Sequence, residues 1–244
     1  MTDLFDSSSD KATKPKAIPK AKPHYHGHRQ RLRQRLLEGG AEAMPDYEIL
    51  ELLLCLAMPQ RDMKPLAKAL IARFGSFAGV LAAESERLLE VPGLKESGLA
   101  ALRTVREAAR RLAKAELGAQ TVIGNWERLI DYCRISQGHD KAERFRILFL
   151  DRKNHLIADE VQQKGTIDHT PLYPREVVKR ALDLGAAALI LVHNHPSGDV
   201  TPSKDDVAMT RAVHEAAAKL GIQLHDHVII SKSGATSFKS LGLL

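Results

Sequence analysis

The sequence predicts a small all-α domain followed by a larger domain of the α/β or α+β class. Two observations predict this division. Between residues 45 and 116 the apolar patterns have helical spacing, whereas from residue 143 onward short apolar runs typical of buried strands alternate with helical segments. The chain has 244 residues, enough for one large or two small domains. Hydrophobic residues (44%) and charged residues (27%) are balanced as in globular proteins, which excludes a mostly disordered chain.

The first segment, residues 1–27, is expected to be a disordered basic tail because Lys, Pro, Ser and Ala dominate it. Residues 1–37 carry nine Lys or Arg and three Asp, whereas residues 38–120 carry 11 basic and 12 acidic residues. The basic character therefore belongs to the N-terminus. This arm either contacts DNA phosphates or serves only to keep the chain soluble.

A helical domain is expected over residues 28–117. Its clearest helix covers residues 45–57, where Pro45 and Asp46 mark the start and an apolar stripe recurs at helical spacing. The stripe consists of Ile49, Leu50, Leu53, Leu54 and Ala57. The other expected helices run from about His28 to Gly39 and over residues 64–73, 76–82, 84–90 and 97–116.

The second domain is expected over residues 122–244, after a linker near residues 118–124. A helix at 127–135 precedes an alternating and then wholly apolar strand at 143–151. Pro174 opens a helix that Gly185 closes. The remaining expected elements are one or two strands at 155–168, a buried strand at 186–195, a helix at 203–221 and a strand at 222–231.

The stretch from residue 189 to residue 206 carries the chemistry. His193 and His195 stand two positions apart at the end of a buried strand, so both point to the same face. Ser203 and Asp206 share a face in the first turn of the next helix. Two imidazoles and one carboxylate suit Zn²⁺, and three protein ligands leave one position for water, as in catalytic zinc sites.

A purely structural interpretation of the same residues stays open. Ser203 and Asp206 also fit a capping box, and histidines at strand ends are often partly buried polar residues. His-x-His pairs occur four times in the chain. We expect the histidines at positions 24, 26 and 28 to be solvent-exposed and not to form a built site, because nothing around them fixes a geometry.

A metal-activated water needs a base, and four carboxylates qualify by position. They are Glu143, Glu160, Glu176 and Asp199. Glu143 begins a strand, Glu160 lies within one, and Glu176 lies in the first turn of a helix, where an acid is favourable without any catalytic role. Spacing alone does not choose among them.

The spacing resembles the JAMM motif of JAB/MPN-type metalloproteases, with its positions at His193, His195, Ser203 and Asp206. The surrounding stretch from about residue 120 to residue 244 resembles the bacterial RadC family. The resemblance implies an MPN/JAB metallohydrolase-like fold that binds Zn²⁺ and cleaves a peptide or isopeptide bond. It implies that His193, His195 and Asp206 are the metal ligands. Glu143 matches the glutamate that activates water, and Ser203 matches the serine that steadies the developing oxyanion.

Two further features of the sequence bear on this resemblance. Asn194 stands where many members of the family carry Ser or Thr, a departure that leaves the metal ligands intact. The segment His225-Asp226-His227 lies on the next expected strand. This segment either surrounds the metal ligands, with Asp226 orienting a ligand histidine as outer carboxylates often do, or is an ordinary strand end.

The helical region contains a candidate DNA contact. Residues 88–105 resemble a helix-hairpin-helix element, in which a Pro-Gly turn presents backbone N–H groups to a phosphate. Pro92 and Gly93 fit this turn, whereas Lys95 replaces the expected second glycine and adds a positive charge. A plain helix-packing turn explains the same residues equally well, and the near-neutral charge of the region argues against strong DNA affinity.

The expected compartment is the reducing cytoplasm. No apolar run approaches the about 20 residues that span a membrane, and the acidic N-terminus lacks the apolar core of a secretory signal. Cys55 and Cys133, two cysteines in all, are too few for a disulfide framework or a cysteine-based zinc site.

The sequence therefore favours a zinc-dependent metalloprotease-like hydrolase that acts on a protein or peptide substrate. A second hypothesis is a DNA-associated repair or recombination accessory protein, in which the metal domain serves binding and not catalysis. A metal nuclease fits less well, because phosphodiester cleavage often uses two metal ions about 3.5–4 Å apart.

Overall fold

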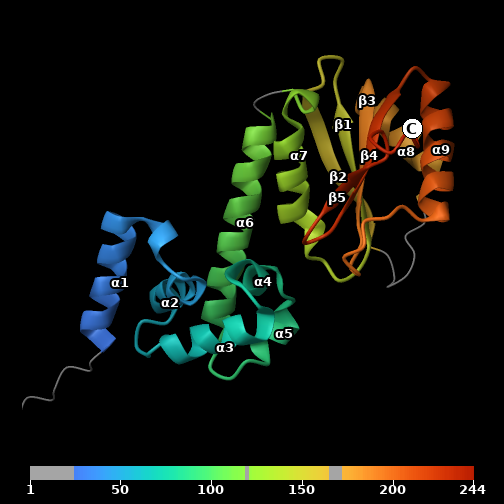
Figure 1. The fold of residues 1–244 in the computed structure, drawn as a ribbon. Helices are drawn as coiled ribbons and strands as arrows, with labels where there is room; N and C mark the ends of the chain where they lie inside the picture. The colour runs from blue at the N-terminus through green and yellow to red at the C-terminus, as the bar shows by residue number, and fades with distance from the viewer. Residues whose placement is uncertain (1–24, 119–120, 165–171) are drawn as a thin grey trace, which may run out of the picture.

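The computed structural model describes residues 25–118, 121–164 and 172–244. Figure 1 shows two parts, a bundle of helices and a sheet flanked by helices, joined through the long helix α6. This is the predicted order of a helical region followed by an α+β domain. Apart from residues 25–27, the predicted basic tail lies outside the described residues.

The helical part consists of six helices and a short 3-10 turn. They are α1 (Tyr25–Gly39), the 3-10 turn Ala41–Ala43, α2 (Asp46–Ala57), α3 (Lys64–Phe74), α4 (Phe77–Ala82), α5 (Ser85–Leu89) and α6 (Glu96–Gly118). Helix α1 begins three residues before the predicted start, so residues 25–27 are helical and not part of a tail. His28, predicted to be exposed, is half-buried, and its Nε2 lies 3.0 Å from Glu51 Oε1.

The core of this part forms around the predicted stripe of α2. Leu50 and Leu54 are fully buried, and Leu53 and Ala57 pack against them together with side chains of α3 and α6. The Asp46 carboxylate accepts a hydrogen bond from the backbone N–H of Phe77 (2.7 Å) and so ties the start of α2 to the start of α4. The prediction of helix 45–57 is confirmed.

Helix α6 packs against both parts. Leu99 and Leu102 contribute to the core of the helical part, whereas Ala113 and Leu117 pack against the sheet domain. Arg106 also forms an ion pair with Asp140 of the sheet domain, 3.3 Å between Nη2 and Oδ1.

Among the described residues, no helix combines the length and the apolar character that a membrane crossing requires.

The second part is built on a mixed sheet of five strands in the order β2-β1-β3-β4-β5. The strands are β1 (Arg144–Leu150), β2 (Leu156–Lys164), β3 (Ala188–Asn194), β4 (Gln223–Ile230) and β5 (Ala235–Ser237). Strands β3 and β4 are parallel, and the other neighbours are antiparallel. The short strand β5 was not predicted, and residues 165–168 of the predicted strand region 155–168 lie outside the described residues.

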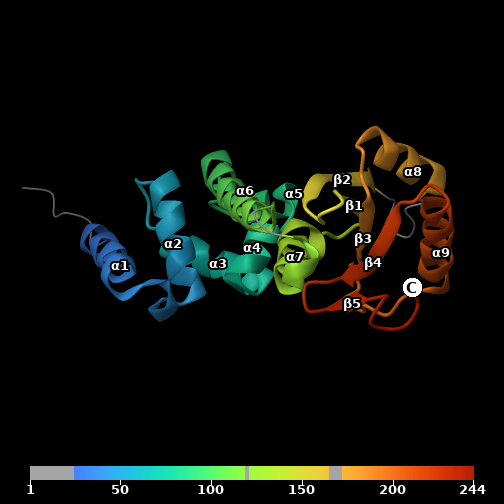
Figure 2. The same ribbon diagram turned by 90° about the horizontal axis from the view of Figure 1, so that it is seen from above.

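Helices cover both faces of the sheet. Helix α7 (Trp126–Cys133), which continues into a π turn at Arg134–Gly138, lies on one face with the end of α6, whereas α8 (Pro174–Asp183) and α9 (Lys204–Ala218) lie on the other (Figure 2). Side chains of β3 alternate between the two cores, with Leu189 and Leu191 toward α8 and α9. This alternation directs His193 toward α9, as the period of two predicts.

Candidate metal centre

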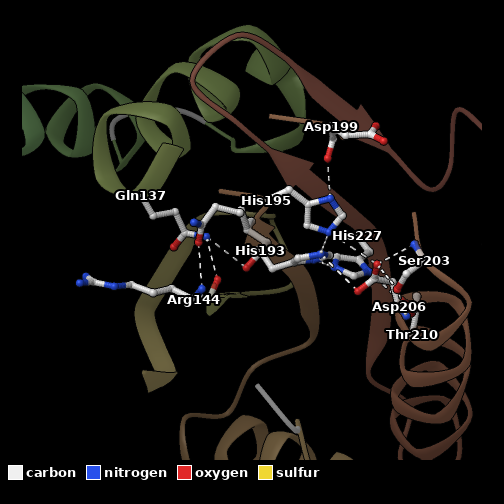
Figure 3. Close-up of polar contacts among 11 residues, drawn as sticks. Gln137, Arg144, His193, His195, Asp199, Ser203, Asp206, Thr210 and His227 are labelled. Carbon is white, nitrogen blue, oxygen red and sulfur yellow. Dashed lines mark hydrogen bonds and ion pairs between the residues drawn. The ribbon is translucent and has the colours of Figure 1, made fainter. Parts of the chain in front are cut away.

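The end of β3 and the start of α9 build the centre. The chain leaves β3 at Asn194, turns through Gly198, whose φ of 94° suits glycine, and enters α9 after Ser203. Because β3 and β4 are parallel and α9 connects them, the start of α9 lies at the carboxyl end of β3. The side chains of His193, His195 and Asp206 converge there, and Figure 3 shows them facing one another.

The spacing of their atoms fits one metal ion. The Nε2 atoms of His193 and His195 lie 2.9 Å apart. Asp206 Oδ1 lies 3.3 Å from His193 Nε2, and Asp206 Oδ2 lies 3.7 Å from His195 Nε2. Zinc bonds of about 2.0–2.2 Å place tetrahedral ligand atoms about 3.3–3.6 Å apart. The three separations lie around this value, so a single small ion fits between the side chains present.

The second ring nitrogen of His195 has a fixed partner. Its Nδ1 lies 2.6 Å from the backbone carbonyl oxygen of Asp199, which accepts a hydrogen bond and cannot donate one (Figure 3). The proton of the neutral ring therefore sits on Nδ1, and Nε2 keeps its lone pair toward Asp206. Carbonyl groups behind metal-binding histidines commonly have this role.

His193 is oriented by a chain of buried polar groups. The Thr210 hydroxyl lies 2.6 Å from the Asp206 carbonyl oxygen and donates its proton to it. The same hydroxyl oxygen lies 2.6 Å from His227 Nδ1 and must accept from it. His227 Nε2, 2.7 Å from His193 Nδ1, then accepts in turn. The hydrogen-bond directions leave the lone pair of His193 Nε2 facing the centre.

The sequence analysis considered the segment His225-Asp226-His227 but named Asp226 as the residue that orients a ligand, whereas the structure places His227 against His193. Asp226 does not have this role, because its carboxylate accepts from the Ser237 hydroxyl and from the backbone N–H groups of His227 and Lys239. An irregularity in the β3–β4 register near Leu189 decides which residue of β4 faces the centre. His225 instead lies 2.7 Å from Asn154 Oδ1.

The electrostatics keep the ligand set ready for a cation. Burial lowers the pKa of His193 to about 4 and holds the pKa of His227 well below its ordinary value, so both rings are neutral at pH 7. The Asp206 carboxylate is the main cause of a raised pKa at His195, because it favours the protonated ring. Burial opposes the ionisation of Asp206, but its contacts with His195, His193 and Ser203 outweigh burial and hold its pKa well below the usual range.

Ser203 and Asp206 also form the capping box that the structural interpretation suggested. Ser203 Oγ accepts from the Asp206 N–H (3.1 Å), and Asp206 Oδ2 accepts from the Ser203 N–H (2.7 Å) and hydroxyl (2.6 Å). Asp206 Oδ1 remains directed toward His193. The Asp206 carboxylate therefore both caps the helix and faces the metal centre, and the Ser203 hydroxyl already donates its proton to this carboxylate.

A cavity of about 670 Å³ opens over the three side chains. Glu143, Ser203 and Asp199 line it, whereas Glu160 and Glu176 do not. Glu160 forms an ion pair with Arg180 of α8 (2.6 Å), and Glu176 stands on the outer surface of α8. Of the four candidate bases, Glu143 and Asp199 remain, and Thr201 N–H donates to the Asp199 carboxylate at 2.9 Å.

Asn194 holds the segment that carries Glu143. Its side chain is fully buried and lies on the face opposite His193. Its Oδ1 accepts from the Arg144 N–H (2.9 Å), and its Nδ2 donates to the carbonyl groups of Asp140 (3.3 Å) and Ala142 (3.1 Å). Three hydrogen bonds thus fix the backbone on both sides of Glu143, a role that the sequence analysis did not consider.

The candidate DNA-contact residues lie elsewhere, in the turn between α5 and α6. Gly93 has a φ of 95° and is exposed, as are Pro92 and Lys95, whereas Val91 and Leu94 are buried beneath them. In Figure 1 this turn lies at the end of α6 away from the sheet. The structure does not bring Gly93 and Lys95 to the metal centre.

Comparison with known proteins points to one family. A family model described as a RadC-like JAB domain matches residues 123–243. A "UPF0758 protein" of Rhodobacter capsulatus is 57% identical over 210 residues, which cover 86% of this chain and 98% of that protein. The "UPF0758 protein SPO0054" of Ruegeria pomeroyi is 52% identical over 210 residues, which cover 86% of this chain and 94% of that protein. Neither printed name states an activity.

Proposed function

The chain belongs to the RadC family of proteins with a JAB domain, and on that premise we propose that it is a zinc-dependent hydrolase of peptide or isopeptide bonds. One observation carries the proposal. Two imidazole nitrogens and a carboxylate lie 2.9–3.7 Å apart in a cavity, and hydrogen bonds behind both rings direct their lone pairs inward. Structural capping alone does not require this arrangement.

The donor set supports zinc. His193, His195 and Asp206 would hold the ion, and a site with three protein ligands keeps one position open. When bound, zinc supplies a water of lowered pKa, about 7, and a positive charge that polarises a carbonyl group.

The remaining roles fall to side chains of the cavity. Glu143 is half-buried on the cavity wall, and we assign to it the transfer of a proton from the attacking water to the departing amine. Ser203 is assigned to the oxyanion, to which its hydroxyl donates after it leaves Asp206 Oδ2. Asn194 keeps Glu143 at the cavity by fixing the backbone around it.

The test is hydrolysis of a library of peptides and isopeptides by the zinc-loaded full chain. Glu143→Gln should keep the fold and the bound zinc and lower turnover about 10²–10⁴-fold, the usual contribution of a positioned base. Glu160→Gln is the matched control, because it makes the same chemical change at a carboxylate paired with Arg180 outside the cavity. Unchanged turnover in Glu143→Gln, or equal losses in both variants, would refute the assignment.

DNA association is a second candidate function, favoured by the turn at Gly93. A phosphate could approach the start of α6 here, because the turn exposes Pro92, Gly93 and Lys95. The space beside Gly93 is open, since a Cβ added there would have no atom within 4 Å apart from its chain neighbours. A salt-dependent mobility shift of labelled DNA by the full chain, lost in Lys95→Glu and on deletion of residues 1–24, would support this function. Equal binding by all three proteins would contradict it.

A further inference from the structure

A second cavity adjoins the metal centre. It has a volume of about 960 Å³ and lies between the helical part and the sheet domain. The end of α3 and helices α4, α5 and α6 form one wall, and the segment around Asp140 together with Pro196 and Lys232 forms the other. Arg144 and His195 line both cavities, so the cleft opens directly beside the centre.

The cleft is strongly basic. Seven Arg or Lys residues line it, against three acidic residues. The basic residues are Arg73, Arg87, Arg103, Arg106, Lys141, Arg144 and Lys232, and the acidic ones are Glu84, Glu86 and Asp140. Four of the 11 basic and two of the 12 acidic residues over positions 38–120 line the cleft, and its other three cations come from the sheet domain. The cavity at the centre has the opposite character, with four carboxylates and one Arg.

The cations of the cleft are held in place by the fold. Arg103 donates to the carbonyl groups of Leu81 (3.2 Å) and Ala83 (2.6 Å) at the end of α4, and to Ser85 Oγ (3.0 Å). These partners carry no full charge, and among the described residues no carboxylate lies within ion-pair distance of Arg103, although Glu86 acts on it from farther away. Burial and the neighbouring Arg106 both lower the pKa of its guanidinium group.

The acidic residues do not balance the cleft. Asp140 is shared between Arg106 (3.3 Å) and Arg144 (3.2 Å), and Lys141 lies 3.8 Å from Glu84. Arg73 forms an ion pair with Glu90, which does not line the cleft. Burial is the main cause of a lowered pKa at His139, Arg106 and Lys232 lower this pKa further, and Asp140 opposes them. Within the described ranges, Arg87 and Lys232 have no carboxylate within ion-pair distance, and Arg87 stacks instead on the Phe74 ring.

We propose that this cleft binds an acidic segment of the polypeptide substrate and thereby presents the adjoining bond to the metal centre. The inference rests on the proposed hydrolase function. The volume lies at the upper end of the range for enclosed ligand sites, about 300–1,000 Å³, which suits a short extended peptide and not a duplex. Three acidic residues, Glu84, Glu86 and Asp140, lie among the cations of the cleft. They would repel an unbroken row of phosphates but accommodate carboxylates that alternate with polar groups.

The test is fluorescence anisotropy with the zinc-loaded full chain carrying Glu143→Gln, so that binding is measured without turnover. The probes are a labelled peptide rich in Asp and Glu, the same peptide with Asn and Gln in their place, and a single-stranded oligonucleotide of equal charge. Arg87→Glu/Lys232→Glu reverses two charges in the cleft. Lys153→Glu/Lys179→Glu is the matched control, because both lysines are exposed and neither lines the cleft.

The acidic peptide should bind more tightly than the neutral peptide and the oligonucleotide, and its affinity should fall with added salt. Reversal of the cleft charges should weaken its binding about tenfold, whereas the control should change it little. The proposal is overturned if no peptide binds, if the neutral peptide or the oligonucleotide binds at least as well, or if the control weakens binding equally. Binding in the cleft with no peptide ever cleaved by the unmodified chain would refute the hydrolase function and leave the anion site standing.

Discussion

Replacement of Thr210 by valine tests the hydrogen-bond chain behind His193. Thr210 is 1% exposed, and valine has nearly its shape, so the change removes little beyond the hydroxyl. Two contacts of 2.6 Å are lost, one with the Asp206 carbonyl and one with His227 Nδ1. The loss at His227 matters more, because this ring has no access to water and its Nδ1 proton then lacks an acceptor.

The expected magnitudes follow from the burial of that proton. A buried donor without a partner costs about 1–3 kcal/mol, so the free energy of unfolding of the metal-free chain should fall by about this amount. Movement of the proton to His227 Nε2 would avoid the cost but place two N–H groups against each other at His193 Nδ1. In either case His193 is less well oriented. Loss of such an outer partner weakens metal binding about 10–100-fold.

The assays are urea denaturation in the presence of a chelator and competition for zinc with a chromophoric chelator. Thr210→Ser restores the hydroxyl and should recover most of the zinc affinity. Thr104→Val is the matched control, because the Thr104 hydroxyl also donates to a carbonyl four residues earlier (2.9 Å) but contacts no histidine. The reasoning fails if Thr210→Val binds zinc as the unmodified chain does, or if Thr210→Ser binds as weakly as the valine variant.

Three further predictions follow from the same geometry. Asn194→Ala removes the three hydrogen bonds of a buried side chain and should lower the free energy of unfolding by about 2–4 kcal/mol, while one zinc per chain is retained. An unchanged urea midpoint would contradict this prediction. Leu102→Ala creates a cavity in the helical core and should cost about 2–5 kcal/mol without altering zinc content, and a loss of zinc would show that the two parts do not act independently. At about pH 5.5, His193 is already neutral, whereas His195, with its raised pKa, is protonated. Zinc binding should therefore release one proton. The affinity for zinc should rise about tenfold per pH unit until the pH reaches the pKa of His195. Calorimetry in buffers of different ionisation enthalpy counts these protons, and a value of two or zero would refute the assignment.

Much of the fold was predictable because local patterns decide it. The stripe on α2 marks the one apolar face of a helix, and the apolar run of β3 marks a strand buried on both faces. The burial of Leu50, Leu54 and Leu191 confirms both predictions. The convergence of His193, His195 and Asp206 follows for the same reason, since a strand end and the next helix start are joined by a short loop.

What the sequence did not predict depends on how distant segments meet. The orienting residue is His227 and not Asp226, because an irregular register between β3 and β4 sets which side chain faces α9. Strand β5 has three residues, too few for an alternating pattern to be recognised. The basic cleft is formed by side chains of α3, α4, α5, α6 and the sheet domain, and a linear count of charges over residues 38–120 does not reveal it.

The most direct test of the account is the zinc content of the full, untagged chain. One zinc per chain is expected, and the His193→Ala/His195→Ala variant should lose it although it keeps the histidines at positions 24, 26 and 28. His225→Ala removes a histidine of β4 that contacts Asn154 instead of the centre, and it should retain the metal. Equal zinc in the unmodified chain and the double variant, or none in either under non-chelating conditions, would contradict the metal centre and the hydrolase proposed from it.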